Sequence, residues 1–258
     1  MKPDYTLYNE DTFAVMGRLP DESFDMIFAD PPYMISSVGT SCQNGKLVAI
    51  NKGKWDNHQS VEANFEFHKR WLKECQRLLK KDGSLWVSGT YHSIHPCGYA
   101  MQQLGIHILN EIVWFKPNAS PNLSCKYFTA SHESLIWARK SAKAKHYFDY
   151  EAMKNGDFPK DTLKKPHHQM RTVWVIPSVP MNEKRFGRHP TQKPLALLER
   201  IILASTPKGA VVFDPFMGSG TTGVAALRLG RRFVGVDSEK QYCELARRRL
   251  NEVDNILL

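Results

Sequence analysis

The residues best suited to chemistry stand in two short motifs, and each motif ends a short apolar run. The first is Asp30-Pro31-Pro32-Tyr33, which follows residues 24–29. The run predicts a strand buried on both faces, and the prolines force the chain out of the sheet, because proline cannot continue a central strand. Ligands of open α/β sheets bind at the carboxyl ends of strands, so we expect Asp30 and Tyr33 to project into a crevice. The alternative interpretation is purely structural: the prolines end the strand, and Asp30 only caps the next helix.

The second motif, DPFMGSGTT at residues 214–222, repeats this arrangement after the apolar residues 211–213. Its glycines, Gly218 and Gly220, allow a sharp turn and a close approach of the backbone to a ligand. The next predicted strand ends at Asp237, an acid placed to accept hydrogen bonds from a ribose. The motif lacks the lysine of an ATP-binding P-loop and the full glycine pattern of a dinucleotide fingerprint. An adenosine ligand without phosphates suits these residues better, and a purely structural turn stays open as the alternative.

These motifs need a sheet to bring them together. Short apolar runs predict seven strands, at residues 5–8, 24–29, 85–87, 106–115, 135–137, 211–213 and 232–236. Helical spacing predicts six helices, at residues 12–16, 61–80, 92–104, 194–205, 221–229 and 239–253. Since most strands are joined through helices, we expect a doubly wound, Rossmann-like α/β fold with a mostly parallel sheet. The fourth and fifth strands are joined without a helix, which predicts an antiparallel hairpin at one edge.

Two segments interrupt this pattern. Residues 140–188 contain eleven Lys or Arg against five Asp or Glu, and so supply most of the net charge of +9. This concentration indicates a polyanionic partner such as nucleic acid, with a merely soluble basic surface as the alternative. We expect residues 140–188 to form a small insertion. Residues 36–56 are rich in Ser, Gly, Asn and Lys and have little periodicity, so we expect a structureless loop that acts as a lid or contacts the nucleic acid.

Composition excludes several classes of protein. The chain has 258 residues, of which 42% are hydrophobic and 24% charged, and this argues against disorder. Five widely spaced cysteines without a CxxC pair indicate free thiols in a reducing compartment. With no apolar signal core and no apolar run of membrane length, we expect a cytoplasmic protein without a membrane partner. No metal is expected, because no acid or cysteine stands at ligand spacing from the histidines at positions His92, His95, His167 and His168.

Both motifs, together with HPTQKP at residues 189–194, make the chain resemble the S-adenosylmethionine-dependent amino-methyltransferases of DNA. The resemblance is to the permuted group, in which the catalytic motif precedes the cofactor motif, and it covers nearly the whole chain. It includes the segments NEDTFAVMGRLPDESFDMIFADPPY and SHESLIWARK. Within that group, PNLSCKYFTASHE, HPTQKP and LLERIILAST are most similar to the adenine methyltransferases of GATC restriction-modification systems.

The resemblance implies how the chain is divided and which residues form the site. Residues 1–139 are the catalytic half of one domain, residues 140–188 its target-recognition insertion, and residues 189–258 its cofactor-binding half. The implied catalytic residues are Asp30, Pro31, Pro32 and Tyr33. The implied S-adenosylmethionine-binding residues are Asp11, Asp30, His189, Thr191, Gln192, Lys193, Asp214, Pro215, Phe216, Gly218, Ser219, Gly220, Thr221, Thr222 and Asp237.

The resemblance also implies what these residues contact. Asp11 would contact the adenine amino group of the cofactor, and residues 189–194 its carboxylate. Residues 214–222 would wrap its methionine portion. Asp237 would hold its ribose, although the commonest residue of the family at this position is glutamate.

The chemistry of an exocyclic amine explains why Asp30 and Pro31 are needed. The lone pair of such an amine is delocalised into the ring, which makes the nitrogen a poor nucleophile. If Asp30 and the Pro31 carbonyl each accept one N–H bond, the lone pair faces the methyl donor, and positioning alone can supply roughly 7–11 kcal/mol. We expect direct in-line transfer, with Tyr33 stacking on a target base that has left the duplex and Pro32 keeping the turn stiff.

DNA is the expected macromolecular partner. Long basic side chains would neutralise its phosphates, from both the loop and the insertion: Lys46, Lys52, Lys54, Lys164, Lys165, Arg171, Lys184, Arg185 and Arg188. A homodimer, and a cognate restriction endonuclease as a genetic partner, are further partners that the resemblance leaves open.

Three other functions compete with N6 methylation of adenine. N4 methylation of cytosine uses the same amine geometry, although a serine at the position of Asp30 is its usual mark. Pro96-Cys97 resembles the nucleophile of cytosine-C5 methyltransferases, but the pair lies at a predicted helix and not at a catalytic loop. The third alternative is a nucleic-acid-binding protein without catalysis, which would have no need of Asp30, Tyr33 and the glycine turn together.

Overall fold

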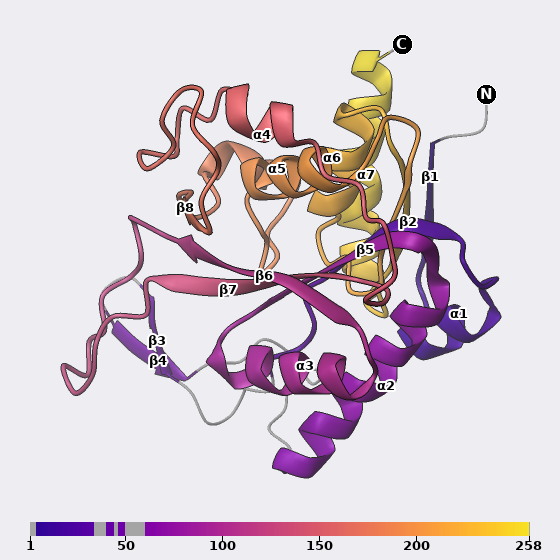
Figure 1. Cartoon of the computed structure of the whole chain (residues 1–258). Coiled ribbons are helices and arrows are strands. Elements are labelled where there is room, and N and C mark those ends of the chain that lie inside the picture. The colour runs from indigo at the N-terminus through magenta and orange to yellow at the C-terminus, as the bar shows by residue number, and fades with distance from the viewer. Residues whose placement is uncertain (1–3, 34–39, 44–45, 50–59, 258) are drawn as a thin grey trace.

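A computed structural model describes residues 4–33, 40–43, 46–49 and 60–257 as an α/β protein with helices on both faces of a central sheet (Figure 1). The strands of this sheet are β1 (Tyr5–Tyr8), β2 (Phe24–Ala29), β5 (Leu79–Gly89), β6 (His107–Phe115), β7 (His132–Arg139), β8 (Val173–Val175), β9 (Val211–Asp214) and β10 (Arg232–Val236). The helices are α1 (Thr12–Arg18), α2 (Val61–Leu78), α3 (Tyr91–Gln103), α4 (Tyr150–Asn155), α5 (Leu195–Ser205), α6 (Thr221–Arg228) and α7 (Lys240–Leu257), with the 3-10 turn η2 (Met181–Lys184). None of the helices in these ranges is both long and apolar enough to cross a membrane.

The strand order is β1-β10-β9-β2-β5-β7-β6-β8. All neighbours are parallel except at β7, which runs antiparallel to both β5 and β6. From β2 the chain continues through β5 on one side, whereas β9 and β10 lie on the other side. The boundary between β2 and β9 is therefore the point at which the strand order reverses, the usual position of a ligand crevice in such sheets.

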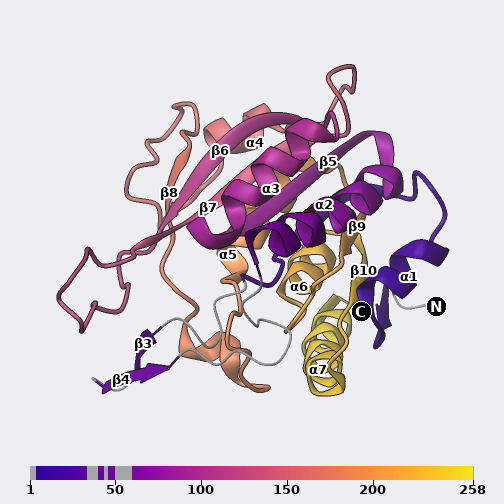
Figure 2. The same ribbon diagram turned by 90° about the horizontal axis from the view of Figure 1, so that it is seen from below.

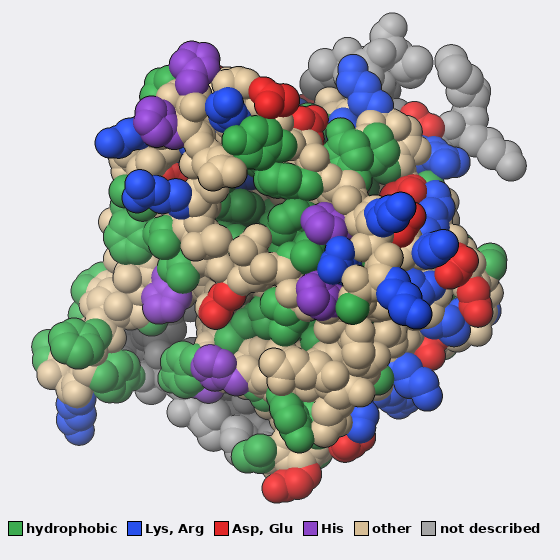
Figure 3. All heavy atoms as spheres, viewed as in Figure 1, with side chains coloured by type: hydrophobic (Ala, Val, Ile, Leu, Met, Phe, Trp, Pro, Cys, Tyr) green, Lys and Arg blue, Asp and Glu red, His purple; other side chains and the backbone are tan. Residues whose placement is uncertain are grey.

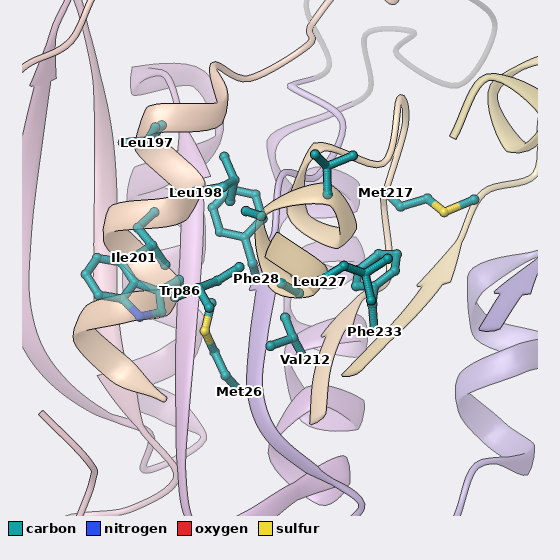
Figure 4. Close-up of a cluster of buried hydrophobic side chains, with 14 of the residues drawn as sticks. Met26, Phe28, Trp86, Leu197, Leu198, Ile201, Val212, Met217, Leu227 and Phe233 are labelled. Atoms are coloured by element: carbon teal, nitrogen blue, oxygen red, sulfur yellow. The ribbon is translucent and has the colours of Figure 1, made fainter. Parts of the chain in front are cut away.

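Alternation along β2 divides the core into two layers. Met26 and Phe28 face one cluster with residues of α5, α6 and α7, including Leu198 (Figure 4). Ile27 and Ala29 face a second cluster with residues of α1, α2 and α3. Because both faces of β2 are covered, the strand is apolar from Met26 to Ala29, as its sequence predicted, and Asp25 near its start is its one charged residue. Figure 2 shows the same arrangement from below, with α2 and α3 lying across the near face of the sheet.

The predicted doubly wound sheet is confirmed, but two predictions about it are wrong. The sheet has eight strands and not seven, because residues 173–175 of the basic segment 140–188 form β8, which pairs in parallel with β6. Consequently β8 forms the edge, and the predicted β6–β7 hairpin lies one strand inside it. Three residues are too short a run to show a strand period, and the polar residues around them hide it.

Two local predictions are also corrected. Residues 36–56 are not a structureless loop throughout, because β3 (Thr40–Gln43) and β4 (Lys46–Ala49) form an antiparallel pair within them. A helix was predicted to residue 80 and a strand from residue 85, but α2 ends at Leu78 and β5 begins directly at Leu79. The pairing between β2 and β5 jumps from Phe24–Leu79 to Met26–Ser84, so residues 80–83 form an irregularity within the strand.

Candidate active site

The two motifs lie side by side at the carboxyl ends of β2 and β9, the adjacency that their sequences required. They form a cavity together with the start of α1, the end of β10 and residues 189–193. Nearly all residues predicted for catalysis or cofactor binding line this cavity: Asp11, Asp30, Pro31, Pro32, Tyr33, His189, Thr191, Gln192, Lys193, Asp214, Pro215, Phe216, Gly218, Ser219, Thr221, Thr222 and Asp237. Residues far apart in the sequence are thus brought to one place.

The glycine turn between β9 and α6 makes the sharp turn that its sequence predicted, with positive φ angles at both glycines. Gly218 has φ +50, and a Cβ there would meet the ring of His189 at 3.0 Å. Gly220, the N-cap of α6, has φ +71, and a Cβ there would lie 2.7 Å from Ala246 of α7. Gly220 therefore allows close packing against α7, and it does not line the cavity as Gly218 does.

Asp214 holds this turn in shape. Its buried carboxylate accepts a hydrogen bond from the backbone N–H of Phe216 at 3.0 Å and from the hydroxyl of Thr222 at 2.6 Å. Burial raises the pKa of Asp214 to about 7, against the effect of these two hydrogen bonds. Both carboxylate oxygens thus accept hydrogen bonds from within the protein, and these bonds stabilise the turn.

Two further acids, Asp237 and Asp11, line the cavity. Asp237, directly after β10, accepts hydrogen bonds from the backbone N–H groups of Gly218 at 3.0 Å and Glu239 at 2.8 Å, and burial raises its pKa to about 6. Asp11 caps the N-terminus of α1, where its side chain accepts from the backbone N–H of Ala14 at 3.0 Å. Hydrogen bonds from the backbone fix each carboxylate in position, and its remaining lone pairs are available to a ligand.

Around Asp30 the structure assembles a buried polar cluster. Lys193 donates to one oxygen of Asp30 at 2.5 Å, and the Tyr33 hydroxyl donates to the other at 2.7 Å. The Tyr33 hydroxyl also contacts Glu133 at 3.1 Å, and Lys116 donates to Glu133 at 2.9 Å. Lys193 and Tyr33 are only 7% and 5% exposed, so these charges are paired with one another and not with water.

The cluster controls the ionisation of its members. Burial raises the pKa of Asp30, an effect that the Lys193 ammonium opposes. For Glu133 burial acts in the same direction, but the ammonium groups of Lys193 and Lys116 outweigh it and lower the pKa to about 2. Burial also favours neutral Lys193, yet its two carboxylate neighbours outweigh this and raise its pKa. Lys193 is therefore the cation on which both acids depend.

Glu133 and Lys116 were missed by the sequence analysis. Glu133 is the one acid in the mostly apolar segment HESLIWAR of β7, and this could have marked it as a candidate site residue. Its partner Tyr33, however, lies 100 positions away in the sequence. Lys116 follows the last residue of β6 and was indistinguishable from other surface lysines. Only the antiparallel pairing of Phe115 with His132 places them side by side.

The predicted DNA-binding residues fall into different environments. Arg171, Lys165 and Arg188 are exposed, and Lys, Arg and His side chains gather over the loop between α4 and β8 (Figure 3). The Lys164 ammonium instead donates to the backbone oxygens of Lys154 and Lys165 at 2.8 and 2.7 Å, and Arg185 forms an ion pair with Glu252. Lys184 ends η2, and Lys46 begins β4; Lys52 and Lys54 lie outside the described residues.

The competing cysteine chemistry finds no support. Cys97 is fully buried in α3, burial raises the pKa of its thiol, and its sulfur lies 3.3 Å from Nδ1 of the buried His68. Burial lowers the pKa of His68 to about 4, so this histidine gives the thiol no cationic neighbour at neutral pH. Neither residue lines the cavity. Within the described ranges, no group of three His, Cys, Asp or Glu side chains is placed to hold a metal ion.

Comparison with known proteins agrees with this geometry. The model of the N6/N4 methyltransferase family, described as DNA methylase, matches residues 24–248. The Type II methyltransferase M2.DpnII of Streptococcus pneumoniae is 49% identical over 250 residues, 96% of this chain and 90% of that protein. The Type II methyltransferase M2.MboI of Moraxella bovis is 43% identical over 256 residues, 98% of this chain and 90% of that protein.

Solved structures extend the comparison to the fold. The crystal structure of the M1.HpyAVI–SAM complex is 28% identical, with a TM-score of 0.68 and coverage of 96% of this chain and 99% of that one. The cytosine-N4-specific PvuII DNA methyltransferase is 18% identical and shares the fold, with a TM-score of 0.72 and coverage of 99% and 93%. Since the family model spans most of the chain and the Type II methyltransferases align over nearly all of it, this protein belongs to the DNA methylase family of N6 and N4 methyltransferases.

Proposed function

We propose that this DNA methyltransferase transfers a methyl group from S-adenosylmethionine to the N6 amine of adenine, as the modification enzyme of a restriction-modification system. One observation carries the proposal: Asp30 and the Gly218 turn, at the ends of neighbouring strands, wall the same cavity. Asp30 is the group that suits an amine, and the glycine turn is the group that suits an adenosine ligand. The similarity to Type II methyltransferases supports the restriction-modification context.

The cavity fits S-adenosylmethionine, which supplies an electrophilic methyl group when it is bound. Gly218 and His189 both line the cavity, and a Cβ at Gly218 would lie 3.0 Å from the His189 ring. Phe13, Phe67 and Phe216 give the cavity apolar walls, and its acids suit a ligand that carries a positive charge. We assign Asp237 to the ribose and Asp11 to the adenine amine of the ligand, with Ser219, Thr221 and Thr222 beside its methionine portion.

Lys193 takes a different role in this proposal from the other cavity residues of its segment. Its ammonium is engaged by Asp30 at 2.5 Å and by Glu133 at 3.5 Å. We therefore assign the cofactor carboxylate to His189, Thr191 and Gln192, and Lys193 to the ionisation of Asp30. Without a cation beside it, a carboxylate in this buried position would favour its protonated form, which accepts hydrogen bonds poorly.

The target amine would be held by the chain's own acceptors. Asp30 and the carbonyl of Pro31 accept its two N–H bonds, which directs the nitrogen lone pair toward the methyl donor. Each oxygen of Asp30 already accepts one hydrogen bond, from Lys193 or from Tyr33, so the carboxylate is fixed before the amine arrives. The exposed basic side chains of Arg171, Lys165 and Arg188 would contact the phosphates of the DNA.

The biological setting follows from the same proposal. Adenine N6 is favoured over cytosine N4 because an aspartate stands at position 30, where serine is the usual mark of cytosine enzymes. GATC is the proposed recognition sequence, a cognate restriction endonuclease the proposed genetic partner, and the cytoplasm the proposed location. A homodimer is the proposed assembly on DNA.

The direct test is to incubate the protein with labelled S-adenosylmethionine and duplex or single-stranded DNA, with and without GATC, and to analyse the nucleosides. The expected product is N6-methyladenine in GATC-containing DNA alone. N4-methylcytosine would contradict the choice of base, and DNA binding without any methylated nucleoside would support the non-catalytic alternative. Asp30→Ala and the isosteric Asp30→Asn should both lose methyl transfer by at least about 10²-fold while they still bind the cofactor.

A further inference from the structure

The loop that joins β6 to β7, residues 116–131, carries two aromatic side chains with almost no cover. Phe128 is 99% exposed and Tyr127 is 67% exposed, and the exposed Lys126 stands beside them. Figures 1 and 2 both show this loop projecting well beyond the body of the protein, and in Figure 3 its tip is a hydrophobic knob at the lower left. An exposed aromatic pair of this kind is a surface in need of a partner.

The direction of the strands places this loop on the catalytic side of the sheet. β2 is parallel to β5, and β7 is antiparallel to both β5 and β6, so β6 runs in the same direction as β2. The loop leaves the carboxyl end of β6, and Asp30 and Tyr33 leave the carboxyl end of β2. The aromatic tip therefore extends from the same edge of the sheet as the site that receives the base.

Hydrogen bonds also tie the root of the loop to that site. The backbone N–H of Lys116 donates to the Ser131 carbonyl at 2.7 Å, which closes the loop. The Lys116 ammonium donates to one oxygen of Glu133 at 2.9 Å, and the other oxygen lies 3.1 Å from the Tyr33 hydroxyl. The root of the loop is thus fixed in position relative to Tyr33.

The tip itself is preformed. Asn122 donates from its side chain to the Tyr127 carbonyl at 2.6 Å, and its side-chain oxygen accepts from the backbone N–H and the hydroxyl of Ser124 at 3.0 and 2.8 Å. Its backbone N–H lies 3.3 Å from the Thr129 hydroxyl. A tip closed by its own polar groups presents its aromatic rings with little further loss of conformational entropy on binding.

We propose that Tyr127 and Phe128 stack on nucleobases of the target DNA next to the base that enters the cavity. This inference rests on the proposed function, because the occupant is chosen as the substrate of the same site. Every base offers a π-face, and the neighbours of an extruded base have a free one, so aromatic rings and an adjacent lysine match exposed bases and their phosphates. An apolar protein groove would have no need of Lys126 at the tip.

The test compares DNA affinity of the wild type, of Tyr127→Ala/Phe128→Ala and of Phe128→Trp. The expected result is a loss of roughly 5- to 150-fold in affinity for each stacked base in the double variant. Phe128→Trp keeps a π-face and should keep the affinity of the wild type. Fluorescence of 2-aminopurine placed beside the target adenine should fall on binding to the wild type and less on binding to the double variant. Cofactor affinity and melting temperature should stay unchanged, because the rings are exposed.

Two controls separate stacking from charge and from loss of any aromatic side chain. Lys126→Ala should reduce the dependence of log affinity on log salt by about one phosphate contact, whereas the aromatic variant should leave this slope unchanged. Tyr99→Ala removes an aromatic side chain that is 57% exposed on α3, and it should leave DNA affinity unchanged. Equal loss in Tyr99→Ala would overturn the assignment to this loop.

The outcomes distinguish this inference from the proposed function. If the wild type binds and methylates DNA and the double variant binds equally well, the stacking role is wrong while the function stands. If the wild type binds DNA but methylates nothing, the function is wrong, and the two affinities still decide the role of the loop. If the double variant only turns a dimer into a monomer in sedimentation, the tip is a contact between copies of this chain, and stacking is overturned.

Discussion

Lys193 is the residue on which the chemistry of the candidate site depends most. A buried acid in the absence of a cation would be neutral, whereas amine orientation requires the lone pairs of an ionised carboxylate. Lys193 lies between Asp30 and Glu133, and Lys116 supplies a second cation to Glu133. The cluster therefore has an acid that is directed at the cavity and an acid that anchors the lysine.

Lys193→Met should lower kcat by about 10²-fold and move the acid limb of the kcat profile to higher pH. The pKa of Asp30 is already raised by burial, and loss of the opposing ammonium raises it further, so a higher pH is needed to form the carboxylate. Lys193→Arg keeps a cation and should shift the limb much less. If Lys193→Met instead lost cofactor affinity and kept its pH profile, the lysine would belong to the cofactor carboxylate.

Glu133 should make the stability of the protein sensitive to acid. Its folded pKa of about 2 lies below its ordinary value of 4.5, so its contribution is fully present above about pH 4.5 and is lost as the pH falls toward 2. This contribution amounts to no more than about 3 kcal/mol. Denaturant unfolding at several pH values should show a steeper loss of unfolding free energy in the wild type than in Glu133→Gln, and parallel curves would contradict the role of Glu133.

Single residues could be predicted where their neighbours in sequence gave them a context. Asp30, Tyr33 and Gly218 were identifiable because each stands at the end of an apolar run or inside a glycine turn. Glu133 was not, because its role comes from a partner on another strand and not from adjacent residues. The two residues of the cluster that were missed are those whose contacts depend entirely on strand pairing.

The turn between β9 and α6 contains two glycines that serve different purposes. Gly218 lines the cavity, whereas Gly220 lies against Ala246 of α7. Both have positive φ angles, which cost other residues about 1–2 kcal/mol. The same chemical change at the two positions should therefore give different results.

Gly218→Ala should weaken cofactor binding at least tenfold, because its Cβ would lie 3.0 Å from the His189 ring in the wall of the cavity. Gly220→Ala should mainly lower the melting temperature, by several degrees, because its Cβ would lie 2.7 Å from Ala246 within the core. Calorimetric titration with S-adenosylmethionine and thermal unfolding without it separate the two effects. Equal losses of affinity in both variants, each corrected for unfolded protein, would show that the distinction is wrong.

Long helices were predicted well from the spacing of their apolar residues, and short elements were not. The helices α2, α5 and α7 each show an apolar stripe over several turns, which survives local exceptions. β8 has only three residues, and it becomes a strand because the side of β6 away from β7 offers it backbone partners. These backbone partners are supplied by the tertiary structure, so the sequence of β8 alone does not predict a strand.

At the level of the whole chain, the doubly wound topology could be predicted from the alternation of strands and helices. The position of the switch point could also be inferred, because two strand-end motifs with complementary chemistry must meet. What could not be inferred was the edge of the sheet, since edge strands are decided by which neighbours remain unpaired. The basic segment of residues 140–188 joins the sheet through β8, and its polar composition alone gave no indication of this.

Strands from the two ends of the sequence alternate in the sheet, so the protein cannot be cut into two halves that each keep their strand pairs. β9 and β10 pair with each other, but β9 also pairs with β2 and β10 with β1. A polypeptide that begins at Met181, which is 66% exposed, would contain β9 and β10 with both outer edges unpaired. Such a fragment should neither fold nor bind the cofactor alone, and the remaining fragment would retain Asp30 without the glycine turn.

Co-expression of residues 1–180 and 181–258 as separate polypeptides should restore a complex that methylates DNA, while each fragment alone should be inactive. The measure is protection of DNA from a nuclease that cuts only unmethylated sites. Activity in either fragment alone would contradict the requirement for both strand pairings. If the two fragments reassemble, methylation becomes a reporter that is on only in cells containing both gene products, because the amine site and the methyl-donor site would be encoded separately.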